Sequence, residues 1–208
     1  MSAASTPEGA SNGAGSRREE LLAIAAGLFA ERGFKNTTVR DIADAAGILS
    51  GSLYHHFDSK ESMVDELLDT FQTDLWEKYD EIEASDLTPK GKLEAVVRAS
   101  FDAIDHHHSE VAIFQNDAGY LTTFERFDYL NERNLKFRTL WLGLLEAGVA
   151  SGELRADLDV ELVYRFLRDT VWVAVRWYRP GGSLTPADVA DQYLTILLEG
   201  IAKNGAPQ

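Results

Sequence analysis

The sequence has no cysteine, no long apolar run and few basic residues, and each shortage excludes something. With zero cysteines, a disulfide framework, thiolate-bound zinc or iron–sulfur clusters and thiol catalysis are excluded. No apolar run approaches the roughly 18–20 residues of a membrane helix, so we expect no membrane partner and a cytoplasmic location. The 20 Lys and Arg residues stand against 34 Asp and Glu residues, a formal net charge of −14. Such an acidic total argues at first against nucleic acid as a partner.

The distribution of charge along the chain weakens that argument. Residues 1–60 hold six basic and seven acidic residues, a net charge of −1, whereas residues 61–208 hold 14 and 27, a net charge of −13. The two parts are therefore expected to face different partners. With 208 residues, 45% of them hydrophobic and 26% charged, the chain can bury a core, and its length predicts one domain or a small module joined to a larger one.

Helical periodicity runs through nearly the whole chain after residue 15. Apolar residues recur at intervals of three and four between Leu21 and Phe29, up to Gly33, a residue type that commonly ends helices. No sustained two-residue alternation is present, so the sequence predicts an all-α fold of about nine helices. We expect a disordered tail at 1–15, a helix-turn-helix domain at 16–60 and a ligand-binding and dimerisation domain at 61–208. The helices after the first are expected at about 38–46, 49–57, 60–84, 89–106, 109–120, 123–150, 157–178 and 186–203.

Residues 34–61 carry the most informative local pattern. Thr38 and the acid three residues later are typical of a capping box at a helix start, and Gly47 ends that helix after about two turns. A second short helix follows, in which Leu53 and Phe57 are expected to face the core. Two short helices joined at a glycine are typical of a helix-turn-helix, whose second helix enters the major groove of DNA.

Side chains on the outer faces of these helices are the expected DNA contacts. Small hydroxylated residues let the backbone approach the groove and pair with several base edges, whereas tyrosine, histidine and cationic side chains suit phosphates. We also expect a flexible arm ahead of the first helix, carrying two arginines. The predicted DNA-binding residues are Arg17 and Arg18 in that arm, Thr38, Arg40, Ser50, Gly51, Ser52, Tyr54, His55 and Lys60.

This region resembles the DNA-reading domain of the TetR family of bacterial transcriptional repressors, over the stretches LLAIAAGLFAERGF and TTVRDIADAAGILSGSLYHHFDSKE. The layout of the chain is similar too, with a long fourth helix and two dimer-forming helices at the end. Two further stretches, AIDHHHSEV and DLDVELVYRFLRDTVWVAVRWYRPGG, resemble a subgroup from mycolic-acid actinobacteria that controls cholesterol (ketosteroid) catabolism. The resemblance implies a repressor, not an enzyme, that needs no cofactor and is released by a coenzyme A (CoA) thioester of a bicyclic steroid fragment.

The penultimate helix is apolar on nearly every side between Val160 and Tyr178. A helix of that kind is buried all round, so part of its surface must meet a second subunit or a ligand. Arg165 has acids four residues away on both sides, whereas Arg168 and Arg176 have none at spacings of three or four. Because an unpaired buried cation costs several kcal/mol, each of these two needs an acid on another helix, the partner subunit or an anionic ligand.

An anionic ligand is the alternative with functional content. Trp172 lies one turn after Arg168 and can stack on a flat ring or a base, so an acyl-CoA would suit the pair. Aromatic residues elsewhere are candidates for the apolar lining, although each also suits an ordinary core. The predicted ligand-binding residues are Arg168, Trp172, Arg176, Tyr164, Phe101, Phe114 and Trp141.

The final helix carries an apolar stripe from Val189 to Ile201, at spacings of three and four residues. Packed with the penultimate helix against a symmetry mate, it predicts a homodimer through the last two helices. A twofold dimer holds its reading helices one or more DNA turns apart, at about 34–36 Å per turn, so the expected partner is a near-palindromic double-stranded operator.

Two alternatives stay open on the sequence alone. Asp105 and the triplet His106–His108 suggest a metal enzyme or hydrolase, but three consecutive histidines point in three directions on a helix, whereas metal-binding helices use residues three or four apart. We therefore expect no metal site and a helix end at this cluster. The other alternative is a dimer that sequesters a ligand without binding DNA, which retention of a palindromic promoter fragment would exclude.

Overall fold

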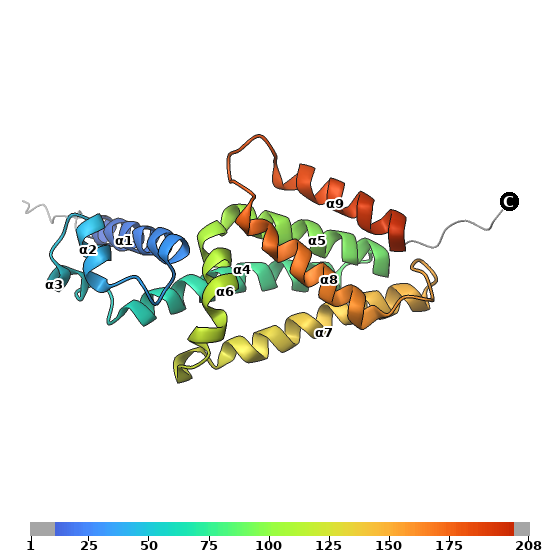
Figure 1. Cartoon of the computed structure of the whole chain (residues 1–208), viewed down its shortest axis with the longest axis horizontal. Helices are drawn as coiled ribbons and strands as arrows, with labels where there is room; N and C mark the ends of the chain where they lie inside the picture. Colours follow the sequence, from blue (N-terminus) through green and yellow to red (C-terminus); the bar gives the residue numbers. More distant parts are fainter. Residues whose placement is uncertain (1–10, 202–208) are drawn as a thin grey trace, which may run out of the picture. The chain divides into compact units, whose positions relative to one another are not determined.

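The computed structural model describes residues 11–201, with side chains from residue 17 to residue 199. Within that part of the chain every regular element is helical, as the sequence predicts (Figure 1). The chain divides into two compact units between Leu68 and Asp69. The elements are α1 (Ser11–Arg32), α2 (Val39–Ala45), α3 (Ser50–Leu53), α4 (Lys60–Ala84), α5 (Pro89–His106), α6 (His108–Leu121), the 3-10 helix η1 (Glu125–Phe127), α7 (Tyr129–Ala150), α8 (Val160–Trp172), the 3-10 helix η2 (Val173–Arg176) and α9 (Pro186–Ile201).

The first helix starts earlier than the sequence predicts. Of the tail expected at 1–15, residues 1–10 lie outside the described residues, whereas residues 11–15 form backbone of α1. A helix grows past its apolar stripe because each added residue gains a hydrogen bond once the helix is nucleated. The arginines at 17 and 18 therefore lie within α1, and the expectation that they precede the first helix is wrong.

The two short helices of the first unit are separated as predicted, but the second is shorter than expected. Gly47 has a φ of 65°, a left-handed conformation that glycine adopts without strain. Helix α3 ends at Leu53, whereas the sequence predicts a helix over about 49–57. The chain tightens there, since the amide of His56 donates to the Leu53 carbonyl at 2.9 Å across a three-residue step. Leu53 and Phe57 are buried, as predicted.

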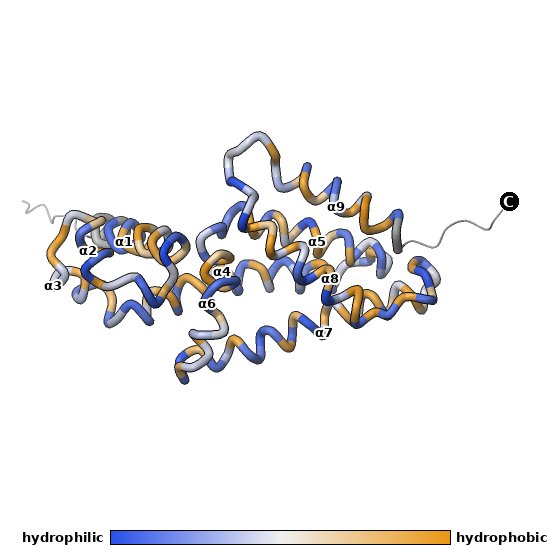
Figure 2. Tube along the Cα trace, viewed as in Figure 1, coloured by the Kyte–Doolittle hydropathy of each residue, from blue (hydrophilic) through white to orange (hydrophobic). Residues whose placement is uncertain are grey.

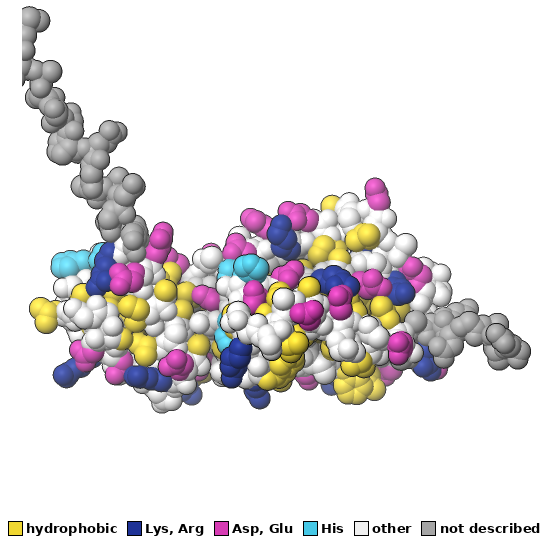
Figure 3. All heavy atoms as spheres, turned by 90° about the horizontal axis from the view of Figure 1, so that it is seen from above, with side chains coloured by type: hydrophobic (Ala, Val, Ile, Leu, Met, Phe, Trp, Pro, Cys, Tyr) yellow, Lys and Arg dark blue, Asp and Glu magenta, His cyan; other side chains and the backbone are white. Residues whose placement is uncertain are grey.

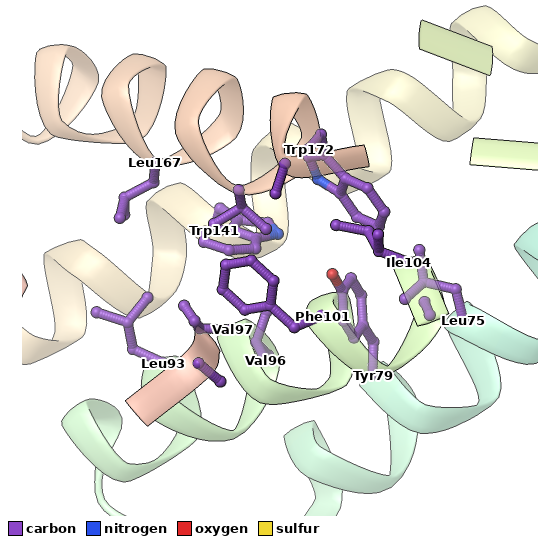
Figure 4. Close-up of a cluster of buried hydrophobic side chains, with 14 of the residues drawn as sticks. Leu75, Tyr79, Leu93, Val96, Val97, Phe101, Ile104, Trp141, Leu167 and Trp172 are labelled. Carbon is purple, nitrogen blue, oxygen red and sulfur yellow. The ribbon is translucent and has the colours of Figure 1, made fainter. Parts of the chain in front are cut away.

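The second unit packs the later part of α4 with α5, α7, α8 and α9 around one hydrophobic core (Figure 4). Helix α5 is central, because it lies beside both α9 and α7 (Figure 1). Trp141 of α7 is fully buried, and the Tyr79 hydroxyl of α4 shares a 2.7 Å hydrogen bond with Ser100 of α5. Burial raises the pKa of Tyr79, so this hydroxyl keeps its proton.

Helix α8 has an inner and an outer face, and not the all-round burial that its composition suggests. Hydrophobic and hydrophilic residues alternate along it (Figure 2). Tyr164, Leu167 and Val171 are buried, whereas Leu162 and Phe166 are 47% and 61% exposed. The helix also ends at Trp172 and continues as η2, short of the predicted end at 178. The tightening is seen where the amide of Trp177 donates to the Ala174 carbonyl at 3.1 Å, across a three-residue step.

The expected helix over 123–150 is interrupted near its start. The segment forms η1 and then α7, which begins at Tyr129. Phe127 is fully buried in η1 and fixes the turn. No helix of the described chain is long and apolar enough to cross a membrane.

Surface cations of the second unit are largely offset by neighbouring acids. Figure 3 shows acidic and basic side chains side by side on the visible face. Arg98 donates to Asp191 at 2.5 Å, and Arg155 donates to Asp157 at 2.7 Å. This surface of the second unit therefore lacks the unbroken positive field that non-specific DNA binding requires.

Candidate functional site: a DNA-reading unit and an arginine-lined cavity

The predicted DNA contacts at the second short helix lie on the surface of the first unit. Ser50, Gly51 and Ser52 form the start of α3, and Gly51 has open space where a side chain would be. Tyr54 is 56% exposed, and His55 is exposed beside it. These five residues offer a backbone without bulky cover, flanked by hydrogen-bonding groups, as major-groove reading requires.

Two other predicted contacts also have roles inside the protein. The Thr38 hydroxyl accepts the amide of Asp41 at 3.1 Å and thereby caps α2. The Lys60 ammonium donates to the carbonyls of Phe34 and Thr37 at 2.9 and 3.0 Å. Thr38, Tyr54 and Lys60 nonetheless line one shallow hollow of about 300 Å³. One of the three ammonium N–H groups stays available to a phosphate.

The two predicted arm residues are held by the fold. Arg17 donates to the Ala46 carbonyl at 3.0 Å. Arg18 forms a two-pronged ion pair with Glu66 and lies 4.4 Å from the centroid of the Phe57 ring. Both cations therefore tie α1 to its neighbours and are not a flexible arm. Arg40 is 84% exposed in its side chain, with only a 3.6 Å pair to Asp44.

One candidate DNA contact was missed from the sequence. Leu49 precedes α3 and is 81% exposed, more than the other exposed large apolar side chains of the described residues. Apolar periodicity treats such a leucine as core, so only its position ahead of Ser50 and Gly51 marks it as a surface residue. An exposed leucine there suits the methyl group of thymine.

The second unit contains a cavity of about 490 Å³ between α4, α6, α7 and α8. That volume lies in the range of small-molecule sites. Its walls carry six aromatic residues and three arginines, two from α7 and one from α8. The lining residues are Phe71, Gln72, Leu75, Trp76, Phe114, Gln115, Arg133, Asn134, Leu135, Phe137, Arg138, Tyr164, Arg168 and Trp172.

Four of the seven predicted ligand residues line this cavity and three do not. Arg168, Trp172, Tyr164 and Phe114 belong to its walls. Phe101 packs on Tyr193 at 5.6 Å between ring centroids, and Trp141 stacks on Phe137 at 5.4 Å, so both serve the core. Arg176 is exposed on η2 and does not line the cavity.

The cavity arginines are each held by an acid that is not part of the lining. Arg168 Nε donates to Asp169 at 2.7 Å, an adjacent residue that spacings of three and four overlook. Arg138 donates to Glu161 at 2.5 Å. Arg133 donates to Asp69 at 2.6 Å. The bond to Asp169 raises the pKa of Arg168, so its charge is secure.

Aromatic side chains hold the inner wall of the cavity in place. Trp172 is 5% exposed and meets Phe71 edge-on at 6.1 Å and Phe137 at 5.9 Å between ring centroids. The indole is therefore fixed by its neighbours, with only a margin left for a ligand. Burial raises the pKa of Tyr164, whose ring lies 5.9 Å from the Arg168 guanidinium, so its hydroxyl stays neutral. This inner wall therefore offers apolar contact beside the guanidinium of Arg168.

Asp105 and the three histidines each bond to a different group, within α5 or on a neighbouring segment, and do not face one shared metal position. Asp105 accepts the Tyr178 hydroxyl at 2.6 Å, and His107 pairs with Asp74 at 3.1 Å. His106 bonds to the Asp102 carbonyl and His108 to the Tyr178 carbonyl, at 2.8 and 3.2 Å. No group of three or more potential ligands able to hold a metal occurs among the described residues.

Both parts of the chain match known protein families. Residues 21–67 match the family described as bacterial regulatory proteins, tetR family, and residues 86–201 match the tetracyclin repressor-like C-terminal domain. The transcriptional repressor KstR2 of Rhodococcus jostii strain RHA1 is 63% identical over 196 residues, which span 94% of this chain and 96% of that protein.

Solved structures agree. The ketosteroid transcriptional regulator KstR2 of Mycobacterium tuberculosis superposes with a TM-score of 0.87 at 56% identity, over 90% of this chain and 96% of that one. A more distant structure, AibR with isovaleryl coenzyme A and operator DNA, has the same fold, with a TM-score of 0.74 at 22% identity over 86% and 97% of the two chains. The chain therefore belongs to the TetR family of transcriptional repressors, within its KstR2 group, and is a regulator and not an enzyme.

Proposed function

We propose that this TetR-type repressor blocks transcription as a dimer and is released from its operator by a CoA thioester from steroid ring degradation. The observation that carries the proposal is the cavity of about 490 Å³, which combines an aromatic wall with three arginines. A repressor that a metabolite releases from DNA needs a binding site for that metabolite, and this cavity supplies one.

The chemistry of the cavity favours a ligand with an anionic and an apolar end. CoA carries several phosphates, and guanidinium groups bind phosphate through paired N–H donors. Arg138 and Arg168 both line the cavity, and both are bonded to acids of α8. A fused-ring acyl group suits the aromatic wall formed by Phe71, Trp76 and Phe137.

The relatives support this effector class. KstR2 of Mycobacterium tuberculosis is described as a ketosteroid transcriptional regulator. AibR, which has the same fold, holds isovaleryl coenzyme A and operator DNA in one structure. The fold is therefore compatible with a CoA ligand, and a steroid-derived acyl group fits the regulon implied by the name of the more similar relative.

A near-palindromic operator follows from a twofold dimer. Exposed apolar residues on the last two helices supply a surface for the partner: Phe166 on α8 and Ile196 on α9 are 61% and 68% exposed. The two helices are joined by a 2.7 Å hydrogen bond between the hydroxyls of Thr170 and Tyr193. Burying such side chains against a second copy gains about 1.5–3 kcal/mol each.

Release requires that the effector bind better to a conformation that does not fit the operator. Its effect is limited by the difference between its affinities for the two conformations. Helix α4 begins at Lys60 in the first unit and supplies Phe71, Gln72, Leu75 and Trp76 to the cavity wall. A ligand that displaces this wall acts on a helix that belongs to both units.

The test uses the protein with a duplex from its own promoter and follows fluorescence anisotropy of the DNA. We expect a steroid-fragment CoA thioester to release the duplex, whereas the free acid and CoA alone do not. Failure of a panel of CoA thioesters, from short acyl to fused-ring acyl, would refute the effector class and leave the DNA-binding assignment standing.

A further inference from the structure

Trp141 of α7 carries a hydrogen-bond donor that the core leaves without a partner. Its side chain is fully buried, and among the buried side-chain nitrogen and oxygen atoms of the described residues its Nε1 atom alone makes no hydrogen bond. A buried N–H group without an acceptor has lost its bonds to water without replacement, so such groups are rare in native proteins. The indole therefore marks a place where a second arrangement of the core can gain a bond.

The hydroxyl of Tyr79 on α4 is the acceptor that this donor faces (Figure 4). The Ser100 hydroxyl donates its one proton to the Val96 carbonyl at 2.7 Å, so Tyr79 is the donor in its own 2.7 Å bond to Ser100. The Tyr79 oxygen can therefore still accept a proton donor. Burial raises the pKa of Tyr79, whereas Ser100 and then the Trp141 indole lower it. The indole thus lies close to the hydroxyl, but short of a hydrogen bond.

Phe137 of α7 connects these two groups with the cavity. Its ring lines the cavity and stacks on Trp141 at 5.4 Å between ring centroids. The same ring lies 6.1 Å from the ring of Tyr79. Protein cores are packed as densely as organic crystals, so a ring pushed from one side moves the rings behind it. A ligand that presses on Phe137 from the cavity therefore shifts the Trp141 indole relative to Tyr79.

We propose that occupation of the cavity closes the missing bond: the ligand displaces Phe137, and Trp141 Nε1 then donates to the Tyr79 hydroxyl. The inference rests on the proposed function of the cavity as the effector site and adds how α7 reports occupancy to α4. The completed chain of donors runs from Trp141 through Tyr79 to Ser100 and joins α7, α4 and α5.

Such a bond contributes to release because it exists in one conformation only. It stabilises the occupied conformation and so adds to the difference in effector affinity on which release depends. Tyr79 and Trp141 act through Phe137 and do not line the cavity themselves. Both are therefore positioning residues.

The indole proton of Trp141 reports the bond directly. Protein with ¹⁵N-labelled tryptophan gives one indole N–H resonance for each of its four tryptophans, and Trp141→Phe identifies the one that belongs to Trp141. An indole proton moves downfield when it enters a hydrogen bond, so a saturating fused-ring steroid CoA thioester should move this resonance downfield. In Tyr79→Phe, which lacks only the hydroxyl, the downfield shift should be absent.

Release of promoter DNA supplies the functional measurement. Tyr79→Phe is expected to bind the duplex as wild-type protein does and to need about fivefold more thioester for release, the value of one hydrogen bond. Its bond to Ser100 is lost in both conformations and so cancels in this comparison. Tyr193→Phe is the matched control, since it removes another tyrosine hydroxyl with a 2.7 Å bond, to Thr170, and should be released at the wild-type concentration.

The outcomes separate this inference from the proposed function. A thioester that releases DNA from wild-type protein without moving the Trp141 resonance downfield, or with an equal shift in Tyr79→Phe, overturns the inferred bond and leaves the effector proposal intact. Release of Tyr79→Phe at the wild-type thioester concentration does the same. If no CoA thioester releases the duplex or moves an indole resonance, the proposed function fails and this inference fails with it.

Discussion

The ammonium of Lys60 lies 4.2 Å from the centroid of the Phe34 ring and donates to the carbonyl of the same phenylalanine at 2.9 Å. From the start of α4 this one side chain closes the segment that joins α1 to α2, since it also donates to the Thr37 carbonyl at 3.0 Å. A residue that motif and charge mark as a DNA contact is thus also part of the scaffold that presents α2 and α3.

Lys60→Met is therefore expected to destabilise the protein. The change keeps the apolar stem but leaves two carbonyls without their donor, at a cost of about 1–2 kcal/mol in the free energy of unfolding. Arg40→Met is the matched control, because that exposed cation makes only a long ion pair and its loss should cost under about 0.5 kcal/mol. Equal urea midpoints for the two variants would show that the Lys60 bonds contribute nothing.

Leu49→Ala is expected to weaken operator binding about three- to tenfold, the value of an apolar contact with one thymine methyl. The check replaces the thymines of a duplex selected by the protein, one at a time, with deoxyuridine, which lacks only that methyl. Wild-type protein should lose affinity at one position, and Leu49→Ala should show no further loss there. Identical sensitivity of both proteins at every position would remove Leu49 from the interface.

Phe166→Glu is expected to convert the dimer to a monomer at micromolar concentration, because it places a charge in the apolar surface of α8. Sedimentation velocity gives the mass directly. Leu87→Glu changes an equally apolar residue, 48% exposed and ahead of α5, and should leave the dimer intact. A dimeric Phe166→Glu variant would place the interface elsewhere.

Asp41 predicts a defined acid sensitivity. The Thr38 hydroxyl, followed by the Thr38 amide, lowers the pKa of Asp41. Because the folded pKa is depressed, the unfolded chain binds the proton more readily, so the contribution of Asp41 to stability is present above its ordinary pKa of about 4 and is lost as the pH falls through the folded pKa. Urea unfolding between about pH 6 and pH 3 should show a shallower loss of stability for Asp41→Asn than for wild-type protein. In a Thr38→Ala background the same substitution should have little effect on that slope, and an undiminished effect would contradict the capping role.

Local sequence patterns predict most of the helices of the fold. The capping box at Thr38, the glycine at 47 and the proline at 89 each predict a helix boundary close to the one observed. The boundaries that differ depend on tertiary packing. Helix α8 stops at Trp172 and η2 follows, while Tyr178 is anchored to Asp105, which lies 73 residues away. No pattern local to residues 172–178 contains that contact.

The residues of the cavity likewise fall into those that local sequence spacing predicts and those that only tertiary packing brings together. Arg168, Tyr164 and Trp172 were found because one helix places them at spacings of four, which a sequence displays directly. Gln72 and Arg133 are 61 residues apart and meet only after α4 and α7 pack, so neither carries a local signal. The partner of Arg168 was missed for the opposite reason, since Asp169 is its immediate neighbour.

The central claim is that the cavity around Arg168 is the switch that releases DNA, and one titration tests it most directly. A fused-ring steroid CoA thioester is added to labelled promoter duplex bound by wild-type protein or by Arg168→Met, and anisotropy is followed. Loss of the guanidinium removes a charged hydrogen bond to the ligand, so Arg168→Met should bind DNA as wild-type protein does but need at least about tenfold more thioester for release. Release of both proteins at the same thioester concentration would contradict the account.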